Sequence, residues 1–161
     1  MTADRFNQEG FSIRAASPSD LEGLLALYRH LNPSDEPVSR DLAPSRLEAI
    51  KQIPGSAVLL GLLDDQLVAS CTLIVIPNLT RGGKPYALIE NVVTDARYRG
   101  RGYGTAILKA ATEAAWDAGC YKVMLMTGSR QPSTLKFYEN AGFEQTTTGF
   151  QMRRISARPD A

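Results

Sequence analysis

The segment Glu90–Thr105 reads ENVVTDARYRGRGYGT and carries the strongest structural signal in the chain. Its valine-rich beginning is typical of a strand, and the strand runs into a loop with glycines at positions 100, 102 and 104. Glycines at a junction between a strand and a helix let the backbone approach a ligand closely, with its N–H groups pointing outward. Because the N-terminus of the following helix adds partial positive charge, the segment predicts a site for a phosphate or pyrophosphate group.

Two common nucleotide-binding motifs do not fit this loop. A P-loop ends in Gly-Lys-Ser/Thr, whereas this loop ends in Gly104-Thr105 and has no lysine there. A dinucleotide fingerprint starting at Gly100 requires glycine where Thr105 stands, and it requires a parallel strand–helix–strand unit. The antiparallel hairpins expected upstream argue against that unit. On the loop alone, a segment that only turns the chain is a competing interpretation.

Outward from this segment, the sequence predicts strands and helices of a single α/β (α+β) domain. Ser17 is the expected N-cap of the first helix, with Pro18 at the first position and Asp20 completing a capping-box pattern. The expected strands span 11–14, 57–63, 66–76, 85–94, 121–127 and 150–155. The first expected helix begins at Pro18 and ends before Asn32-Pro33, and the others span 44–52, 102–118 and 132–140. This order of elements predicts a mixed, largely antiparallel sheet flanked by helices, with Trp116 of the long helix in the core.

Composition limits the kind of protein further. The chain has 161 residues, 43% of them hydrophobic, which is enough for one domain with a core. A net charge of +1 gives no reason to expect nucleic acid as a partner, and no apolar run approaches the roughly 20 residues of a membrane span. The polar residues 1–10 are expected to be a disordered start without a signal peptide, and 157–161 a flexible tail.

The two cysteines, Cys71 and Cys120, lie in apolar runs far apart in sequence. A secreted domain stapled by disulfides usually has more cysteines, and a zinc site needs ligands at closer spacing. We therefore expect two reduced, buried thiols in a cytoplasmic protein. No cluster of Cys, His and Asp has the spacing of metal ligands, so no metal site is expected.

Two separate motifs resemble the GNAT acetyltransferase superfamily. Arg99-x-x-Gly102-x-Gly104 after a Val-rich strand resembles its pyrophosphate loop, and Phe137–Phe143 (FYENAGF) is similar to its Tyr-containing helix that ends in Gly-Phe. The resemblance runs from Ile13-Arg14 to about Arg154 and implies one GNAT-like domain over residues 11–156. It also implies acetyl-CoA as co-substrate, no metal, a small-molecule amine as acceptor, and a homodimer that uses an exposed last strand as its edge.

Within that superfamily, the chain looks most like the eukaryotic-type glucosamine 6-phosphate N-acetyltransferases. The shared stretches are Ile89–Val93, Tyr98-Arg99-Gly100, Gly119–Lys122 and Phe137-Tyr138-Glu139. The chain departs from them at residues 126–130, where that group carries acidic residues in its sugar-binding region. The sequence therefore leaves the acceptor amine unassigned.

The resemblance also assigns roles to individual residues. It implies that the backbone of Val92, Val93 and Thr94 pairs with the pantetheine arm. The implied pyrophosphate site comprises Arg99, Gly100, Arg101, Gly102, Tyr103, Gly104 and Thr105, which contribute mostly main-chain groups.

Two side chains are the candidate catalytic groups, with Glu90 as general base and Tyr138 as general acid. A substrate ammonium must lose a proton before it can attack, and the apolar neighbours of Glu90 on its strand favour a carboxylate that accepts one. The phenol of Tyr138 can protonate the leaving thiolate. Both side chains also have ordinary structural explanations, in an ion pair for Glu90 and in the core for Tyr138.

The single histidine, His30, is expected at a helix C-terminus, where the helix dipole favours it without any catalytic role. Two other classes of function remain open at this point. One is a protein or peptide N-acetyltransferase, and the other is a CoA-binding sensor without catalytic activity.

Overall fold

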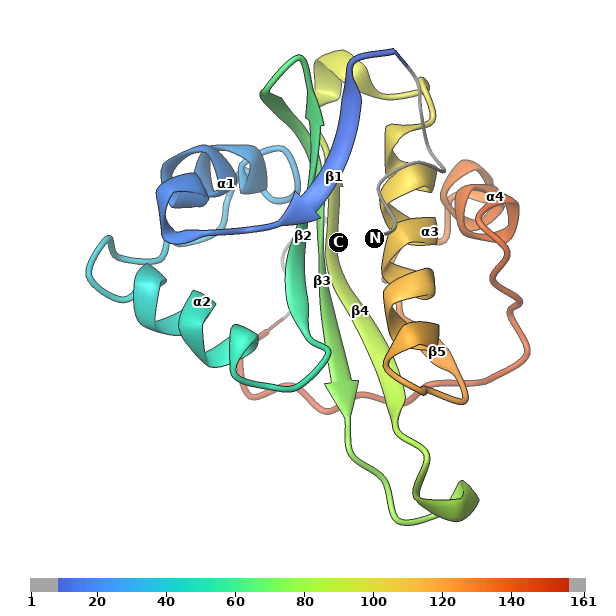
Figure 1. The fold of residues 1–161 in the computed structure, drawn as a ribbon. Helices are drawn as coiled ribbons and strands as arrows, with labels where there is room; N and C mark the ends of the chain where they lie inside the picture. Colours follow the sequence, from blue (N-terminus) through green and yellow to red (C-terminus); the bar gives the residue numbers. More distant parts are fainter. Residues whose placement is uncertain (1–8, 157–161) are drawn as a thin grey trace.

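The computed structural model describes residues 9–156, which form a five-stranded sheet with helices on both faces (Figure 1). The strand order is β1-β2-β3-β4-β5, and every neighbouring pair is antiparallel except β4 and β5, which are parallel. The strands are β1 (Phe11–Ala15), β2 (Ala57–Leu63), β3 (Gln66–Ile76), β4 (Tyr86–Thr94) and β5 (Val123–Leu125), and the helices are α1 (Leu21–Tyr28), α2 (Ala43–Lys51), α3 (Tyr103–Asp117) and α4 (Pro132–Asn140). The expected fold class is confirmed.

The helices divide into two pairs, with α1 and α2 on one face of the sheet and α3 and α4 on the other (Figure 1). Beneath α3, the fully buried Ile107 and Ala111 pack against Cys71, Leu73 and Ile89 of the sheet. Small alanines on this stripe let the helix lie close to the strands. A second core under α1 and α2 joins their leucines to apolar side chains of β2, namely Leu24, Leu47, Val58, Leu60 and Leu62.

Local sequence signals explain the sharp boundaries of the first elements. Asp64 and Asp65 both have positive φ (47° and 64°), which makes the tight turn between β2 and β3. A 3₁₀ turn precedes α1, and the carboxylate of Asp20 accepts a hydrogen bond from the Ser17 N–H at 2.8 Å, as the capping pattern predicts. Arg14 of β1 donates to the same carboxylate at 2.7 and 2.8 Å, which ties the first strand to the first helix.

The sheet opens between β4 and β5, and this opening positions the site. Strand β5 pairs only with Ala87–Ile89 of β4, although β4 continues to Thr94. A bulge in β4 lies just beyond Ile89. The register between β3 and β4 shifts between Ser70 and Thr72, and Asn91 adopts a φ of 52°. Beyond Ile89, the backbone groups of β4 that face β5 have no strand partner among residues 9–156.

Three expectations about the second half of the chain are wrong. The strand expected over 121–127 is only Val123–Leu125, and the strand expected over 150–155 does not form. Phe150 and Met152 are 94% and 100% exposed, because after α4 the chain runs past the lower end of the sheet without joining its edge (Figure 1). A β-branched or aromatic run becomes a strand only where a partner strand is available.

The third is Trp116, which is 49% exposed instead of buried in the core. The buried stripe of α3 passes through Ala111 and Ala115, and the next residue along the helix points about 100° away from it. The tail expected at 157–161 and most of the N-terminal segment expected at 1–10 lie outside the described residues. Among the helices of residues 9–156, none has the length and apolar character needed to cross a membrane.

Candidate active site

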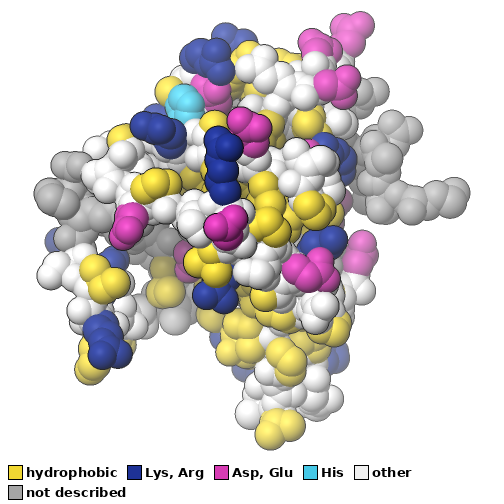
Figure 2. Space-filling model, turned by 90° about the vertical axis from the view of Figure 1, so that its left-hand side faces the viewer, with side chains coloured by type: hydrophobic (Ala, Val, Ile, Leu, Met, Phe, Trp, Pro, Cys, Tyr) yellow, Lys and Arg dark blue, Asp and Glu magenta, His cyan; other side chains and the backbone are white. Residues whose placement is uncertain are grey.

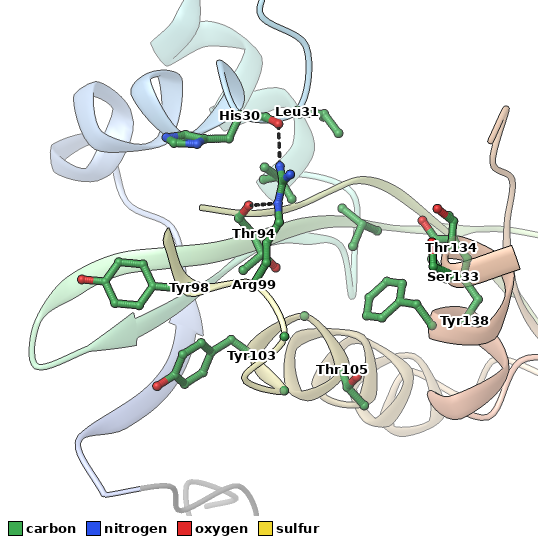
Figure 3. Close-up of a pocket in the computed structure, with 16 residues that line it drawn as sticks. His30, Leu31, Thr94, Tyr98, Arg99, Tyr103, Thr105, Ser133, Thr134 and Tyr138 are labelled. Carbon is green, nitrogen blue, oxygen red and sulfur yellow. Dashed lines mark hydrogen bonds between the residues drawn. The ribbon is translucent and has the colours of Figure 1, made fainter. Parts of the chain in front are cut away.

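A cavity of about 770 Å³ lies where β4 leaves β5 (Figure 3). Its walls come from the last residues of β4, the glycine loop, the first turn of α3, one face of α4 and the residues after α1. The lining residues are His30, Leu31, Val92, Val93, Thr94, Tyr98, Arg99, Gly100, Gly102, Tyr103, Gly104, Thr105, Ser133, Thr134, Phe137 and Tyr138. Of the residues predicted to bind the cofactor, all but Arg101 line this cavity.

The glycine loop approaches the cavity with its backbone. Gly100 and Gly102 have positive φ (73° and 87°), and Gly102 is the N-cap of the 15-residue helix α3. Since a left-handed conformation at two nearby positions strongly favours glycine, the sequence requirement at these positions is conformational. The loop thereby presents the N-terminus of α3, with its unpaired N–H groups, to the cavity.

Aromatic packing anchors this loop to the sheet. Tyr103 is buried, and its ring lies 4.7 Å from Phe11 and 6.4 Å from Tyr98, measured between ring centroids. Arg101 points elsewhere: its guanidinium stacks over the Tyr98 ring at 5.4 Å. The side chain of Arg101 therefore supports the loop from outside the cavity.

Arg99 links two walls of the cavity. Its Nε donates to the Thr94 carbonyl at 3.2 Å and its Nη2 donates to the His30 carbonyl at 2.9 Å (Figure 3). The side chain thus ties the end of β4 to the residue that follows α1. A guanidinium has further donors, so the same group also puts positive charge beside the cavity.

Asp95, which follows β4, connects the end of that strand to His30. The carboxylate is 4% exposed, and it accepts hydrogen bonds from the Arg97 backbone N–H at 2.9 Å and from Arg97 Nη2 at 2.8 Å. His30 Nε2 lies 3.9 Å from it, while His30 Nδ1 accepts a hydrogen bond from the Ala96 N–H at 3.2 Å. Hydrogen bonding by the Arg97 side chain, helped by its backbone N–H and by His30, lowers the pKa of Asp95 to about 2.

This depressed pKa predicts how stability depends on pH. The contribution of Asp95 is fully present above the ordinary carboxyl pKa of 3.8 and is lost as the pH falls through about 2. Asp95→Asn is expected to lower Tm by about 3–8 °C at pH 7, with the gap from wild type closing towards pH 2. Thermal unfolding followed by circular dichroism from pH 2 to pH 7 measures this, with the exposed Asp41→Asn as control. A gap that stayed constant across that range would contradict the prediction.

Helix α4 places Tyr138 on the cavity wall opposite the end of α1 (Figure 3). Burial, and secondly the charge of Glu90, raise the pKa of the Tyr138 phenol above its ordinary value of 10. The phenol therefore keeps its proton at neutral pH and can donate it. Thr134, one helical turn earlier, lies on the same wall and its hydroxyl accepts from Ser129 Oγ at 3.2 Å.

Glu90 lies beside the cavity and not on its wall. It is half-buried on β4, opposite Thr72 of β3, at the start of the bulge. The charge of Glu90 raises the pKa of Tyr138 on α4, so the structure brings the two predicted catalytic side chains into the same neighbourhood.

Several wall residues were not predicted from the sequence. The predicted Tyr138 could have indicated three of them, all on the same helix. Thr134 lies about one turn before Tyr138 on the same face, and Phe137 and Ser133 flank that face. His30 and Leu31 follow α1, and only the superfamily resemblance, in which the loop after this helix shapes the acceptor pocket, places the end of the helix near the cavity. The His30 carbonyl accepts a hydrogen bond from Arg99 Nη2, whereas the His30 ring accepts one from the Ala96 N–H in the loop after β4.

Gly104 offers a test of how tightly this site is built. A Cβ at Gly104 would lie 3.1 Å from Phe137 Cζ and 3.1 Å from Thr94 Oγ1, closer than normal packing. Gly104→Ala is therefore expected to push α3 away from β4 and α4, and to weaken acetyl-CoA binding about tenfold. Calorimetric titration measures this. The control is Gly23→Ala in α1, whose Cβ would meet only Leu67 at 3.8 Å; equal affinity in both variants would contradict the account.

Comparisons with known proteins agree with this geometry. Residues 24–143 match the model of the acetyltransferase (GNAT) family. A glucosamine 6-phosphate N-acetyltransferase from Trypanosoma brucei brucei is 32% identical over 133 residues, which are 81% of this chain and 87% of that protein.

Two solved structures share the fold. A protein from Agrobacterium tumefaciens strain C58 assigned as an acetyltransferase is 48% identical with a TM-score of 0.83, covering 89% of this chain and 99% of that one. An aminoglycoside N-acetyltransferase in complex with CoA is 20% identical with a TM-score of 0.73, covering 93% of this chain and 100% of that one. The family match over most of the chain and the trypanosomal relative together show that this protein belongs to the acetyltransferase (GNAT) family and is an acetyl-CoA-dependent N-acetyltransferase of that type.

Proposed function

We propose that this enzyme transfers the acetyl group of acetyl-CoA to the primary amine of a small molecule, by direct attack in a ternary complex. The observation that carries the proposal is the opening of the sheet beyond Ile89, with the glycine loop on one side of it and Tyr138 on the other. Glu90 stands beside the same opening. Two substrates can meet there between a proton acceptor and a proton donor.

The residues present fit acetyl-CoA as co-substrate. The edge of β4 at Val92–Thr94, which β5 does not cover, can pair with an extended, amide-containing chain as an added strand would. The N-terminus of α3 and the backbone of Gly100–Thr105 can hold a pyrophosphate. Gly104 packs closely against Phe137 and Thr94, which keeps the first turn of α3 and the end of β4 together at this wall.

Acetyl-CoA supplies a thioester whose carbonyl carbon accepts the amine nitrogen. Glu90, through a water molecule, takes the proton that the ammonium must lose before its lone pair can attack. Backbone N–H groups at Val92–Thr94 can stabilise the oxygen that gains negative charge. Tyr138 gives its phenolic proton to the departing sulfur, whose ordinary thiol pKa is about 8.5, as the carbon–sulfur bond breaks. The nitrogen then loses its second proton to solvent to give the neutral amide, and the Tyr138 phenolate takes a proton back from solvent.

A small-molecule acceptor is favoured by what the relatives are named for. The trypanosomal relative is named for glucosamine 6-phosphate, which makes this amine the first to test. On the face covered by α1 and α2, basic and acidic side chains are interspersed around a patch of hydrophobic ones (Figure 2). This mixed surface offers no extended charged track for a polymeric acceptor.

Mass spectrometry of the acceptor after incubation with acetyl-CoA tests this function. We expect N-acetylated glucosamine 6-phosphate or another acetylated small amine, and initial rates that give intersecting double-reciprocal lines because both substrates bind before reaction. Short peptides form the comparison arm. Acetylation of peptides alone would replace the proposal with a peptide N-acetyltransferase, and parallel lines would contradict direct attack.

We also propose that the enzyme is a homodimer in which residues 150–155 pair with a second copy. Phe150, Met152 and Ile155 are almost fully exposed, and β5 is a short edge strand with one free side. Light scattering after size exclusion should give a dimer for wild type and a monomer for Met152→Asp. Leu79→Asp, at an equally exposed leucine in the β3–β4 connection, should leave the dimer intact. A monomeric wild type would contradict this proposal.

The proposed location is the cytoplasm. Cys71 and Cys120 are both free and buried, and burial raises the pKa of the Cys71 thiol to about 12. A protein whose thiols stay reduced suits a reducing compartment. Fractionation of the source cells, with detection of this chain, tests the location.

A further inference from the structure

Three hydroxyl groups lie together under α1, in a layer that is otherwise apolar. Ser70 and Thr72 of β3 are 0% and 5% exposed, and Tyr28 closes the end of α1 above them. Burial raises the pKa of the Tyr28 phenol, and its neighbours Thr72 and Ser70 oppose that rise. The surrounding side chains are those of the second core, such as Leu24 and Leu60.

The Ser70 hydroxyl is the unusual member of this cluster. Its Oγ is fully enclosed beside the Tyr28 hydroxyl, yet neither that hydroxyl nor another atom in the described part of the chain meets it in good hydrogen-bond geometry. Buried hydroxyls in native proteins are almost always satisfied, so an orphan of this kind points to a water molecule or ligand as its partner.

The β4 bulge brings this cluster to the active site. Thr72 stands directly opposite Glu90 in the β3–β4 ladder, and Ser70 stands opposite Val93, which lines the cavity. Directly opposite residues in an antiparallel pair have Cβ atoms about 5 Å apart and share one face of the sheet. The Thr72 side chain therefore lies beside Glu90, on the same face of the sheet. Tyr138 from α4 is a titratable group whose pKa the charge of Glu90 raises, while Tyr28 from α1 approaches Thr72 and Ser70.

We infer that Tyr28, Ser70 and Thr72 are positioning residues that hold a water molecule against Glu90, through which the acceptor amine loses its proton. The inference rests on the proposed function and names the residues that make its proton transfer work. In this step an N–H bond of the ammonium breaks as an O–H bond forms on the water. At the same time a water O–H bond breaks as an O–H bond forms on the Glu90 carboxylate, which frees the nitrogen lone pair for attack.

Ser70→Ala is the most informative variant, because removing an unsatisfied buried hydroxyl should leave Tm unchanged or raise it. If the cluster holds the water, kcat nevertheless falls about tenfold and the acid limb of the kcat/KM–pH profile moves. Thr72→Val should act in the same way, while Thr72→Ser, which keeps the hydroxyl, should restore both readouts. Thr112→Val is the matched control, since that hydroxyl only donates to the Leu108 carbonyl on α3.

The experiment uses the full chain with acetyl-CoA and the amine that wild type acetylates. Unchanged kcat and pH profile in Ser70→Ala and Thr72→Val would overturn the inference while the proposed function stands. A loss of kcat that follows a loss of Tm, and that Thr72→Ser does not reverse, would also overturn it by showing a structural role. Failure of wild type to acetylate any amine would remove the proposed function and the inference with it.

Discussion

Glu90→Gln is expected to lower kcat about 10²–10³-fold, because an amide of the same shape cannot accept the proton of the substrate ammonium. Binding of acetyl-CoA should change little, since Glu90 does not line the cavity whose wall includes the glycine loop. The rise of kcat/KM with pH should flatten, because the remaining rate depends only on amine that is already neutral in solution. Steady-state kinetics across pH 5–9 measure both effects.

The comparison variant is Glu113→Gln, which removes a carboxylate from α3 outside the cavity lining. It should have wild-type kcat and an unchanged pH profile. If Glu90→Gln kept the wild-type pH profile as well, Glu90 would have no part in proton removal. Thr72 and Ser70 would then lose their proposed role too.

Tyr138→Phe is expected to lower kcat about 10²-fold while the Kd for acetyl-CoA stays within a factor of about two. The ring still packs against Phe137, whose centroid lies 4.9 Å away, so the wall keeps its shape. Only the proton donor for the departing sulfur is lost. Burial and the charge of Glu90 raise the pKa of this phenol, so wild type should keep the donor protonated to beyond pH 10.

Tyr121→Phe serves as the control for Tyr138. Its ring lies edge-on to Tyr86 at 6.4 Å, at the far end of β4 from the cavity. Kinetics and calorimetric titration should show no change in that variant. Wild-type kcat in Tyr138→Phe would remove the proposed acid, and a large rise in Kd would make Tyr138 a binding residue instead.

Local signals predicted the fold well wherever an element is specified by its own residues. Three elements have their predicted bounds, namely the strands 57–63 and 66–76 and the helix 132–140. Local residues set these bounds, because Asp64-Asp65 form the turn between the strands and Pro132 begins the helix. The strand expected at 150–155 failed for the opposite reason. Its apolar residues need a partner strand, and periodicity cannot say whether one is present.

The sequence predicted those parts of the site that consist of backbone groups. The glycines of the loop and the strand before it form one continuous segment, so a motif could locate them together. The rest depends on tertiary contact: Arg99 reaches the His30 carbonyl 69 positions earlier, and Thr72 meets Glu90 only through the β3–β4 register. The hydroxyls under α1 carry no sequence signal, because serine and threonine in a strand are common. Their proposed role is indicated only by their burial and by the bulge at Asn91, which are features of the folded chain.

The most direct test of the account is release of free thiol from acetyl-CoA in the presence of different amines. The panel comprises aminosugar phosphates, polyamines, amino acids, aminoglycosides and short peptides. The account predicts release that depends on one class of small amine and that falls at least 10²-fold in Glu90→Gln. Measurable binding of acetyl-CoA without thiol release in the presence of any of these amines would contradict it and favour a CoA-binding sensor.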